Sequence, residues 1–249
     1  MTLKSHGLAL WLLLFSFSAT FLFADDAAEW KDRVARLTKA IAAAPTTVDL
    51  YSQRGDAQFF LGEFVPAAAD YDKMVELAPS EDAGHWRRGI AWFYAGDYEK
   101  AAGQFERYHS FDNVDRENGI WRYLCQLKAF GLEQARAGLL KYEKDDREPF
   151  GDVYRLFEGK MTAEALLDKI RQAKISDTER EKRLFYAELY VGLNEAVEDR
   201  TDSAKAHLAA AAKNTWGEKA GYGPNYMWHV ARLHAEVLAK PVVPDPKKR

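Results

Sequence analysis

Cysteine is almost absent from this sequence of 249 residues. Cys125 is the only one, so no disulfide can form within one chain, and the fold must be held together by packing. We also expect no lipid anchor attached through cysteine, because such an anchor requires a cysteine at the end of an N-terminal apolar run. Cys125 lies in an apolar helical pattern, where we expect it to act as a small buried hydrophobic residue.

The sequence also lacks an excess of either charge and any sustained alternation of polar and apolar residues. Lys and Arg total 35 and Asp and Glu total 38, for a formal net charge of −3. Nucleic-acid binding is not expected, because it depends on a concentrated basic face. Without alternation at a period of two residues, we expect essentially no β-sheet. An all-α fold is predicted.

A long uncharged run occurs only at the N-terminus. Lys4 and His6 precede a stretch from Gly7 to Ala24 that contains no charged residue and ends before Asp25. A short basic start, an apolar stretch and a small residue before acidic residues are typical of a secretory signal peptide. We therefore expect residues 1–24 to direct export to the periplasm or the medium. Leu22 occupies a position where a small residue is preferred for cleavage, so an uncleaved membrane anchor is the alternative.

Similar residues recur at an interval of 34 residues. The pairs are Gly55 and Gly89, Gly62 and Gly96, Ala67 and Ala101, Tyr71 and Phe105, and Pro45 and Pro79. This period, with small residues at fixed points, aromatic residues around them and a terminal proline, is the signature of the tetratricopeptide repeat (TPR), a pair of antiparallel helices. The sequence therefore predicts an all-α solenoid of TPR-type helix pairs over residues 25–240, divergent in its C-terminal half.

Each recurring residue has a physical reason for its place. Gly55 and Gly89 fall in the middle of a helix, where glycine costs about 1 kcal/mol relative to alanine, which suggests a close contact between helices. Gly62 and Gly96 fall at helix ends, where a left-handed cap favours glycine. The remaining members of the set that we assign to packing between helices are Ala67, Ala101, Tyr71 and Phe105.

The repeat pattern extends beyond these two units with decreasing regularity. We expect a helix before the first repeat, a third unit, four further helical stretches, a glycine-rich connection, a last helix and a disordered tail. The first helix covers 30–44 and the third unit 121–139. The four further helical stretches are 149–160, 162–173, 177–198 and a helix through Ala204, Leu208 and Ala211. The glycine-rich connection covers 217–224, the last helix 225–239 and the disordered tail 241–249.

Three stretches resemble a more specific family. They are WRYLCQLKAFGLEQARAGL from Trp121, PFGDVYRLFEGKMTAEALLDKI from Pro149 and RLFYAELYVGLNEA from Arg183. In their order and spacing they are similar to the bacterial TPR lipoprotein NlpI family. The resemblance implies a homodimeric scaffold in the cell envelope that brings peptidoglycan hydrolases and a processing protease together. The lipid-bearing cysteine of that family is missing here, so tethering to the outer membrane is not implied.

The first helix of each TPR pair lines a concave groove. Counting from the glycines, we predict a partner-binding surface that is rich in Trp, Tyr and Arg, the residue types most enriched at binding hot spots. Packing between repeats is the alternative role for the aromatic members. The predicted surface consists of Asp56, Phe59, Phe60, Trp86, Arg87, Phe93, Tyr94, Trp121 and Arg122.

Motifs for catalysis are missing. We find no glycine-rich phosphate loop, no Gly-x-Ser-x-Gly elbow and no His-Glu-x-x-His pair. His229 and His234 are five residues apart, about 140° around a helix, which is poor geometry for one metal ion. We therefore expect no enzyme activity, metal, cofactor or small-molecule substrate. The predicted function is an exported adaptor for proteins, and the alternative is a periplasmic holdase that binds unfolded chains through the same groove.

Overall fold

The computed structural model describes residues 17–144 and 146–239, with side chains from Ala27 onward. These residues form thirteen α-helices and one short 3-10 helix, and none of them forms a strand. The predicted all-α solenoid is therefore confirmed. The predicted tail 241–249 and most of the predicted signal peptide, residues 1–16, lie outside the described residues.

The two regular repeats have the geometry that the period of 34 predicts. The first consists of α2 (Val48–Phe60) and α3 (Phe64–Leu77), and the second of α4 (Trp86–Ala95) and α5 (Tyr98–Phe111), with η1 (Pro79–Glu81) between them. Gly62 and Gly96 have positive φ angles of 77° and 87°, as expected at these helix ends.

The mid-helix glycines Gly55 and Gly89 allow the paired helices to approach closely. A Cβ added to Gly55 would lie 2.6 Å from the Tyr71 ring, and one added to Gly89 would lie 2.7 Å from the Phe105 ring. Both rings are fully buried, as are Ala67 and Ala101. The predicted packing set is therefore found where the two helices of each pair meet.

An arginine precedes each of these glycines and links the two helices of its pair. Arg54 donates to both carboxylate oxygens of Asp70 at 2.8 and 2.7 Å, and Arg88 donates from Nε to Gln104 at 2.9 Å. The next arginine at the same interval, Arg122, donates to the carbonyl of Gly138 and forms an ion pair with Glu106. Arg122, which we expected in the groove, therefore lies between paired helices.

The third unit departs from the repeat. Its first helix is α6 (Arg116–Phe130), but its second, α7 (Leu132–Ala137), has only six residues and ends before Leu139. Tyr123 occupies the position that corresponds to Gly89, and its buried ring contacts Phe157 edge to face, with centroids 5.2 Å apart. A side chain of this size prevents the close helix contact that the glycine allows, so the space beside α6 is shared with α8.

The C-terminal half returns to paired helices. They are α8 (Phe150–Phe157) with α9 (Ala163–Gln172), and α10 (Asp177–Val197) with α11 (Thr201–Ala212). Gly159 has a φ of 73° where we expected the break between helices. In α10, a Cβ on Gly192 would lie 2.7 Å from Leu208, so the glycine contact of the first repeats recurs here.

The predicted glycine-rich connection 217–224 is wrong. Residues Thr215–Lys219 form the short helix α12, and α13 (Tyr222–Ala239) begins three residues before the expected Asn225. The Asn214 side chain accepts hydrogen bonds from the backbone N–H groups of Trp216 and Gly217, which caps α12. This local cap offsets the weak helix propensity of the glycine.

The first helix, α1 (Phe17–Ala43), runs through the expected cleavage point after Ala24. Among the described residues, no helix is long and apolar enough to span a membrane. The apolar stripe of α1 packs within the chain: Leu37 and Ile41 are buried, and Trp30 contacts Phe60 edge to face at 5.0 Å.

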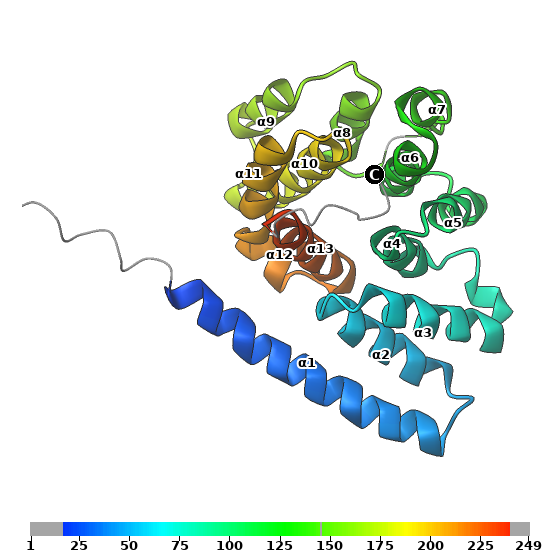
Figure 1. The fold of residues 1–249 in the computed structure, drawn as a ribbon. Helices are drawn as coiled ribbons and strands as arrows, with labels where there is room; N and C mark the ends of the chain where they lie inside the picture. Colours follow the sequence, from blue (N-terminus) through cyan, green and yellow to red (C-terminus); the bar gives the residue numbers. More distant parts are fainter. Residues whose placement is uncertain (1–16, 145, 240–249) are drawn as a thin grey trace, which may run out of the picture.

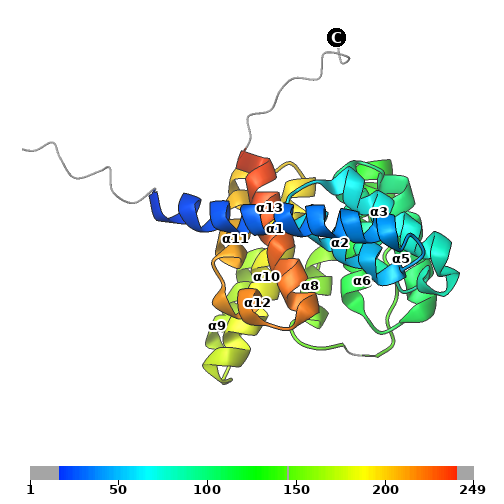
Figure 2. The same ribbon diagram turned by 90° about the horizontal axis from the view of Figure 1, so that it is seen from below.

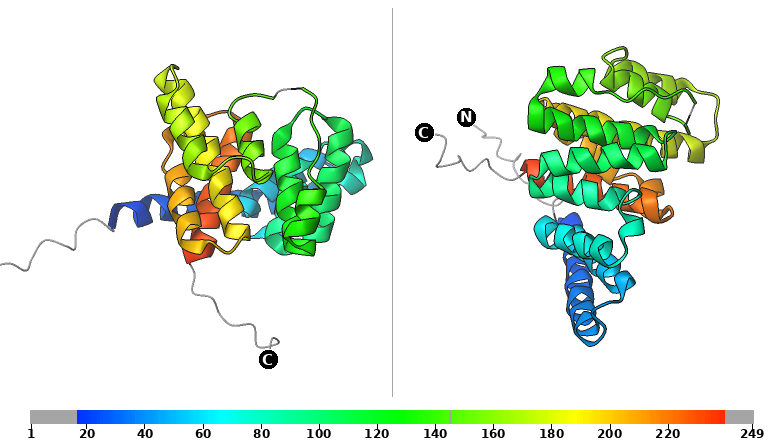
Figure 3. Two further views of the ribbon diagram at one scale, coloured as in Figure 1. Left: turned by 90° about the horizontal axis from the view of Figure 1, so that it is seen from above. Right: turned by 90° about the vertical axis from the view of Figure 1, so that its right-hand side faces the viewer.

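The helices are arranged in an arc whose two ends meet. Figure 1 shows the regular repeats on one side and α8 to α11 on the other, with α12 and α13 between them. Figure 2 shows α1 crossing α13, and the left view of Figure 3 shows α13, in red, beside α11. The last helix therefore lies against the inner face of the first repeats.

Candidate functional site

The groove of the first two repeats is occupied by α13. The ring of Tyr226 stacks on Phe59 with centroids 4.7 Å apart and meets Trp86 edge to face at 4.9 Å. One turn further along α13, His229 stacks on Phe60 at 3.9 Å. Phe59, Phe60 and Trp86 of the predicted partner-binding surface are therefore covered by a segment of the same chain.

Polar contacts hold α13 in the same position. Asp56 accepts hydrogen bonds from Tyr71 of α3 at 2.6 Å, from Arg87 of α4 at 2.7 Å and from Tyr222 of α13 at 2.5 Å. Further along α13, the Tyr94 hydroxyl lies 2.8 Å from Nδ1 of His234. These contacts engage Asp56, Arg87 and Tyr94, three residues of the predicted partner-binding surface, within the chain.

The remaining members of that surface have different environments. Phe59, Phe60, Phe93 and Trp121 are buried, with at most 7% of any of them exposed. Arg122 lies between helices, as described above. Trp86 and Trp121, however, also line a cavity that α13 leaves open. They are the two residues of the predicted partner-binding surface that line this cavity.

This inner cavity has a volume of about 380 Å³ and lies between the second and third repeats and the C-terminal helices. Its buried lining includes the side chains of Ile90, Phe105, Trp121 and Met227, which we call its floor, and also those of Tyr108, Asn118 and Tyr186. The full lining consists of Trp86, Ile90, Phe105, Tyr108, Asp115, Glu117, Asn118, Trp121, Arg147, Lys182, Tyr186, Trp216, Gly223, Pro224 and Met227.

Carboxylates gather on one side of the inner cavity around a single guanidinium group. Arg147 forms ion pairs with Glu117, with Asp115 at 3.7 Å and with Asp146 at 3.2 Å. Glu117 also accepts a hydrogen bond from Tyr190 of α10. Burial raises the pKa of Glu117 to about 7, with Arg147 acting in the opposite direction. Burial likewise raises the pKa of Asp115.

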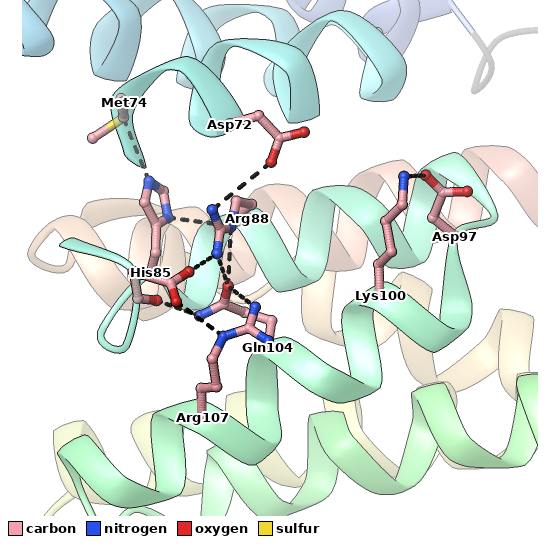
Figure 4. Close-up of polar contacts among 9 residues, drawn as sticks. Asp72, Met74, His85, Arg88, Asp97, Lys100, Gln104 and Arg107 are labelled. Atoms are coloured by element: carbon pink, nitrogen blue, oxygen red, sulfur yellow. Dashed lines mark hydrogen bonds and ion pairs between the residues drawn. The ribbon is translucent and has the colours of Figure 1, made fainter. Parts of the chain in front are cut away.

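A second cluster of ionisable groups, around Arg88, serves to join helices (Figure 4). His85 caps α4 by accepting from the backbone N–H of Arg88 at 3.2 Å, and its other ring nitrogen lies 3.4 Å from the sulfur of Met74. Burial lowers the pKa of His85 to about 3. Gln104 donates to the carbonyl of Asp82 at 2.6 Å. Each of these groups is engaged by a neighbour.

A polar hollow of about 790 Å³ lies against α8, α9 and the segment before α8. Its charged side chains are largely paired with one another: Asp152 binds Lys169 and lies 3.7 Å from Arg155, and Lys160 lies 3.2 Å from Glu158. Across residues 17–144 and 146–239, no group of three His, Cys, Asp or Glu residues could hold a metal ion.

Comparison with known proteins gives one short similarity. No family model matches the chain. Over 43 residues it is 46% identical to a "Protein SGT1 homolog" of Oryza sativa subsp. japonica. The similarity covers 17% of this chain and 12% of that protein, so the chain spans about an eighth of the relative's length. The helical repeat fold by itself favours a general role in protein–protein interaction.

Sequence reasoning missed much of the inner cavity. Glu117, Arg147, Trp216 and Met227 come from segments far apart in the chain, and only the closure of the arc brings them together. One local signal was available: the Asp115-x-Glu117 pattern marks the start of α6, where Asp115 accepts from the backbone N–H of Glu117 at 3.0 Å. That signal locates the carboxylates on a helix start but not beside a cavity.

Proposed function

We propose that this protein is an exported TPR scaffold that binds protein partners in the cell envelope. The observation that carries the proposal is the solenoid of helix pairs with an aromatic-lined cavity on its inner side. Solenoids of this kind use their concave surfaces for binding, and Trp and Tyr in partly buried pockets are frequent hot spots. Because α13 covers the groove of the first repeats, we assign partner contact to the inner cavity and its rim.

The test uses a photoactivatable cross-linking residue at one of two positions of the full-length chain. Trp216 is a partly buried residue at the rim of the inner cavity, whereas Val65 is 66% exposed on α3, outside the cavity lining. After irradiation in intact cells, we expect a short and reproducible set of cross-linked proteins from position 216 and a different or empty set from position 65. Identical sets from both positions would contradict binding at the cavity.

Peptidoglycan hydrolases and a processing protease are the partners that the family resemblance suggests. Their presence among the proteins cross-linked from position 216, identified by mass spectrometry, would support this finer proposal. A reproducible set without them would keep the scaffold and reject this choice of partners.

Export is proposed on the basis of the apolar run that ends at Ala24. N-terminal sequencing of the protein purified from its native cells should begin near Asp25. An intact Met1, together with retention in membranes after a carbonate wash, would favour the uncleaved anchor.

The periplasmic holdase remains the alternative function. A holdase would suppress the aggregation of unrelated unfolded proteins, whereas a scaffold would not. The coverage of Phe59, Phe60 and Tyr94 by α13 favours the scaffold, because it removes much of the apolar groove that a holdase would present.

A homodimer is also proposed from the resemblance. Leu37 and Ile41 of α1 are buried within the chain, so we expect the interface to use another surface. Light scattering of residues 25–249 at micromolar concentration should give about twice the monomer mass, and a monomer mass would reject the dimer.

A further inference from the structure

The inner cavity has the size and lining of a pocket for a bulky apolar side chain. Its volume of about 380 Å³ falls near the lower end of the range of roughly 300–1,000 Å³ that is typical of ligand pockets. The buried floor of Ile90, Phe105, Trp121 and Met227 presents apolar and aromatic atoms. Such a floor favours an aromatic or large aliphatic side chain, which gains from losing its contact with water.

Carboxylates outnumber cations in the cluster around Arg147 beside this floor, where Asp115 and Glu117 line the inner cavity and Asp146 lines the polar hollow against α8 and α9. Arg147 is the cation shared by Asp115, Glu117 and Asp146, and Asp112 adds to the negative potential at Asp115. Lys182 also lines the cavity, but its ammonium group lies 3.4 Å from Glu179 on its own helix. The positive charge of a bound ligand would therefore offset the excess negative charge of the carboxylates that share Arg147. This cluster is partly buried, where interactions between charges are stronger than in bulk water.

An extended peptide can satisfy both features at once. Side chains two positions apart point to the same side of an extended chain, so one can enter the apolar floor while the other reaches the acidic rim. We propose that the inner cavity binds an extended segment of a partner protein in which a bulky apolar side chain lies two residues from a lysine or arginine. This inference rests on the proposed protein-binding function and specifies which segments the protein recognises.

The direct test measures the binding of capped heptapeptides to the full-length protein by calorimetry. The probe is acetyl-Gly-Ser-Trp-Gly-Arg-Ser-Gly-amide, and the matched peptides carry alanine in place of tryptophan or glutamate in place of arginine. We expect the probe to bind at least tenfold more tightly than either matched peptide. Equal affinities, or no binding of the probe, would overturn the proposal.

Two glycines provide a matched pair of variants. Gly223 lines the inner cavity, Gly221 does not, and a Cβ added to either would meet no atom within 4 Å. Both substitutions should therefore leave the fold intact, which thermal melting checks. We expect Gly223→Trp to fill the cavity and abolish probe binding, and Gly221→Trp to bind normally. Normal binding by Gly223→Trp would contradict the assigned site.

Glu117 links binding to pH in a way that packing alone would not. Because the pKa of Glu117 is raised to about 7 by burial, its carboxylate is only partly charged at neutral pH. Probe affinity should rise from pH 6 to pH 8, and Glu117→Gln should remove this rise and reduce the preference for arginine over glutamate. Affinity that is flat or falls over this range would count against the acidic rim. The other ionisable groups that face Glu117 are Tyr108, Asp115, Asp146, Arg147, Tyr186 and Tyr190.

The two proposals fail in different ways. If position 216 cross-links to a reproducible set of partners but the peptides show no selectivity, the scaffold function is supported. The preference for a bulky apolar side chain two residues from a lysine or arginine is then rejected. If the peptides bind selectively but no partner is cross-linked from position 216, the cavity recognises this peptide pattern. The proposed scaffold function in the cell envelope is then rejected.

Discussion

At the scale of single residues, glycine is the clearest determinant of this fold. Gly89 and Gly103 both lie inside helices, α4 and α5, yet their surroundings differ. A Cβ on Gly89 would lie 2.7 Å from the buried Phe105 ring, whereas one on Gly103 would lie 3.6 Å from the flexible Arg107 guanidinium group. The same substitution should therefore have opposite effects at the two positions.

We predict that Gly89→Ala lowers the free energy of unfolding by about 1–3 kcal/mol, because the added methyl group forces the two helices apart. Gly103→Ala should raise it by up to about 1 kcal/mol through improved helix propensity. Urea denaturation of both variants measures this difference. Stabilisation by Gly89→Ala would show that the helices are not in close contact.

Asp56 is a second residue whose effect should be large. It accepts hydrogen bonds from three donors on three different helices, including the largely buried Arg87. Asp56→Ala leaves that guanidinium group without its carboxylate and should cost about 3–5 kcal/mol. Glu76→Ala is the matched control, because Glu76 is a 67% exposed partner in a surface ion pair and should cost less than about 1 kcal/mol. Similar costs for the two variants in urea would argue against the Asp56 contacts.

At the scale of elements, α13 determines which surfaces of the repeats are available. Its Tyr226 is fully buried and contacts Phe59, Phe60 and Trp86. We predict that Tyr226→Ala lowers the free energy of unfolding by about 3–5 kcal/mol, the usual cost of truncating a large core side chain. Val237→Ala on the same helix should cost little, because Val237 is 42% exposed. Thermal melting followed by circular dichroism compares the two, and equal shifts would show that α13 is not anchored by Tyr226.

The repeat elements could be predicted because their signals are local. Gly62, Gly96 and Gly159 end helices through backbone conformations that follow from residue type. The shortening of α7 also has a sequence cause, since Tyr123 replaces the glycine of the earlier repeats. The extension of α1 upstream to Phe17 and the start of α13 at Tyr222 were not predicted. Helix ends depend on neighbouring contacts as well as on the residues themselves.

At the scale of the whole molecule, buried histidines should make stability dependent on pH. Burial lowers the pKa of His85 and His229 to about 3 and that of His234 to about 4, whereas an unfolded histidine titrates near 6.5. The unfolded chain therefore binds more protons between these values, so stability is fully present above about pH 6.5 and is lost as pH falls toward 3–4. Each histidine should cost about 2 kcal/mol on going from pH 7 to pH 5.

Glu117 acts in the opposite direction over part of this range. Its raised pKa means that the folded state takes up a proton near pH 7, before the unfolded state does, which offsets roughly one histidine. We expect a net loss of stability from pH 7 to pH 5 in urea denaturation, and a smaller loss in His229→Gln. An unchanged pH dependence in that variant would show that His229 does not control the acid sensitivity.

The sequence by itself determined the class of fold, the period of the repeats and the residues that pack within each helix pair, because these depend on contacts between residues close together in the chain. Gly55 with Tyr71 and Gly89 with Phe105 are separated by only sixteen residues. Tertiary structure alone decided that α13 fills the first groove and that Trp86 and Trp121 share a cavity with Glu117, Arg147 and Trp216. These contacts join residues as far apart as Phe59 and Tyr226. They depend on small rotations between successive repeats, which add up along the solenoid until its two ends meet.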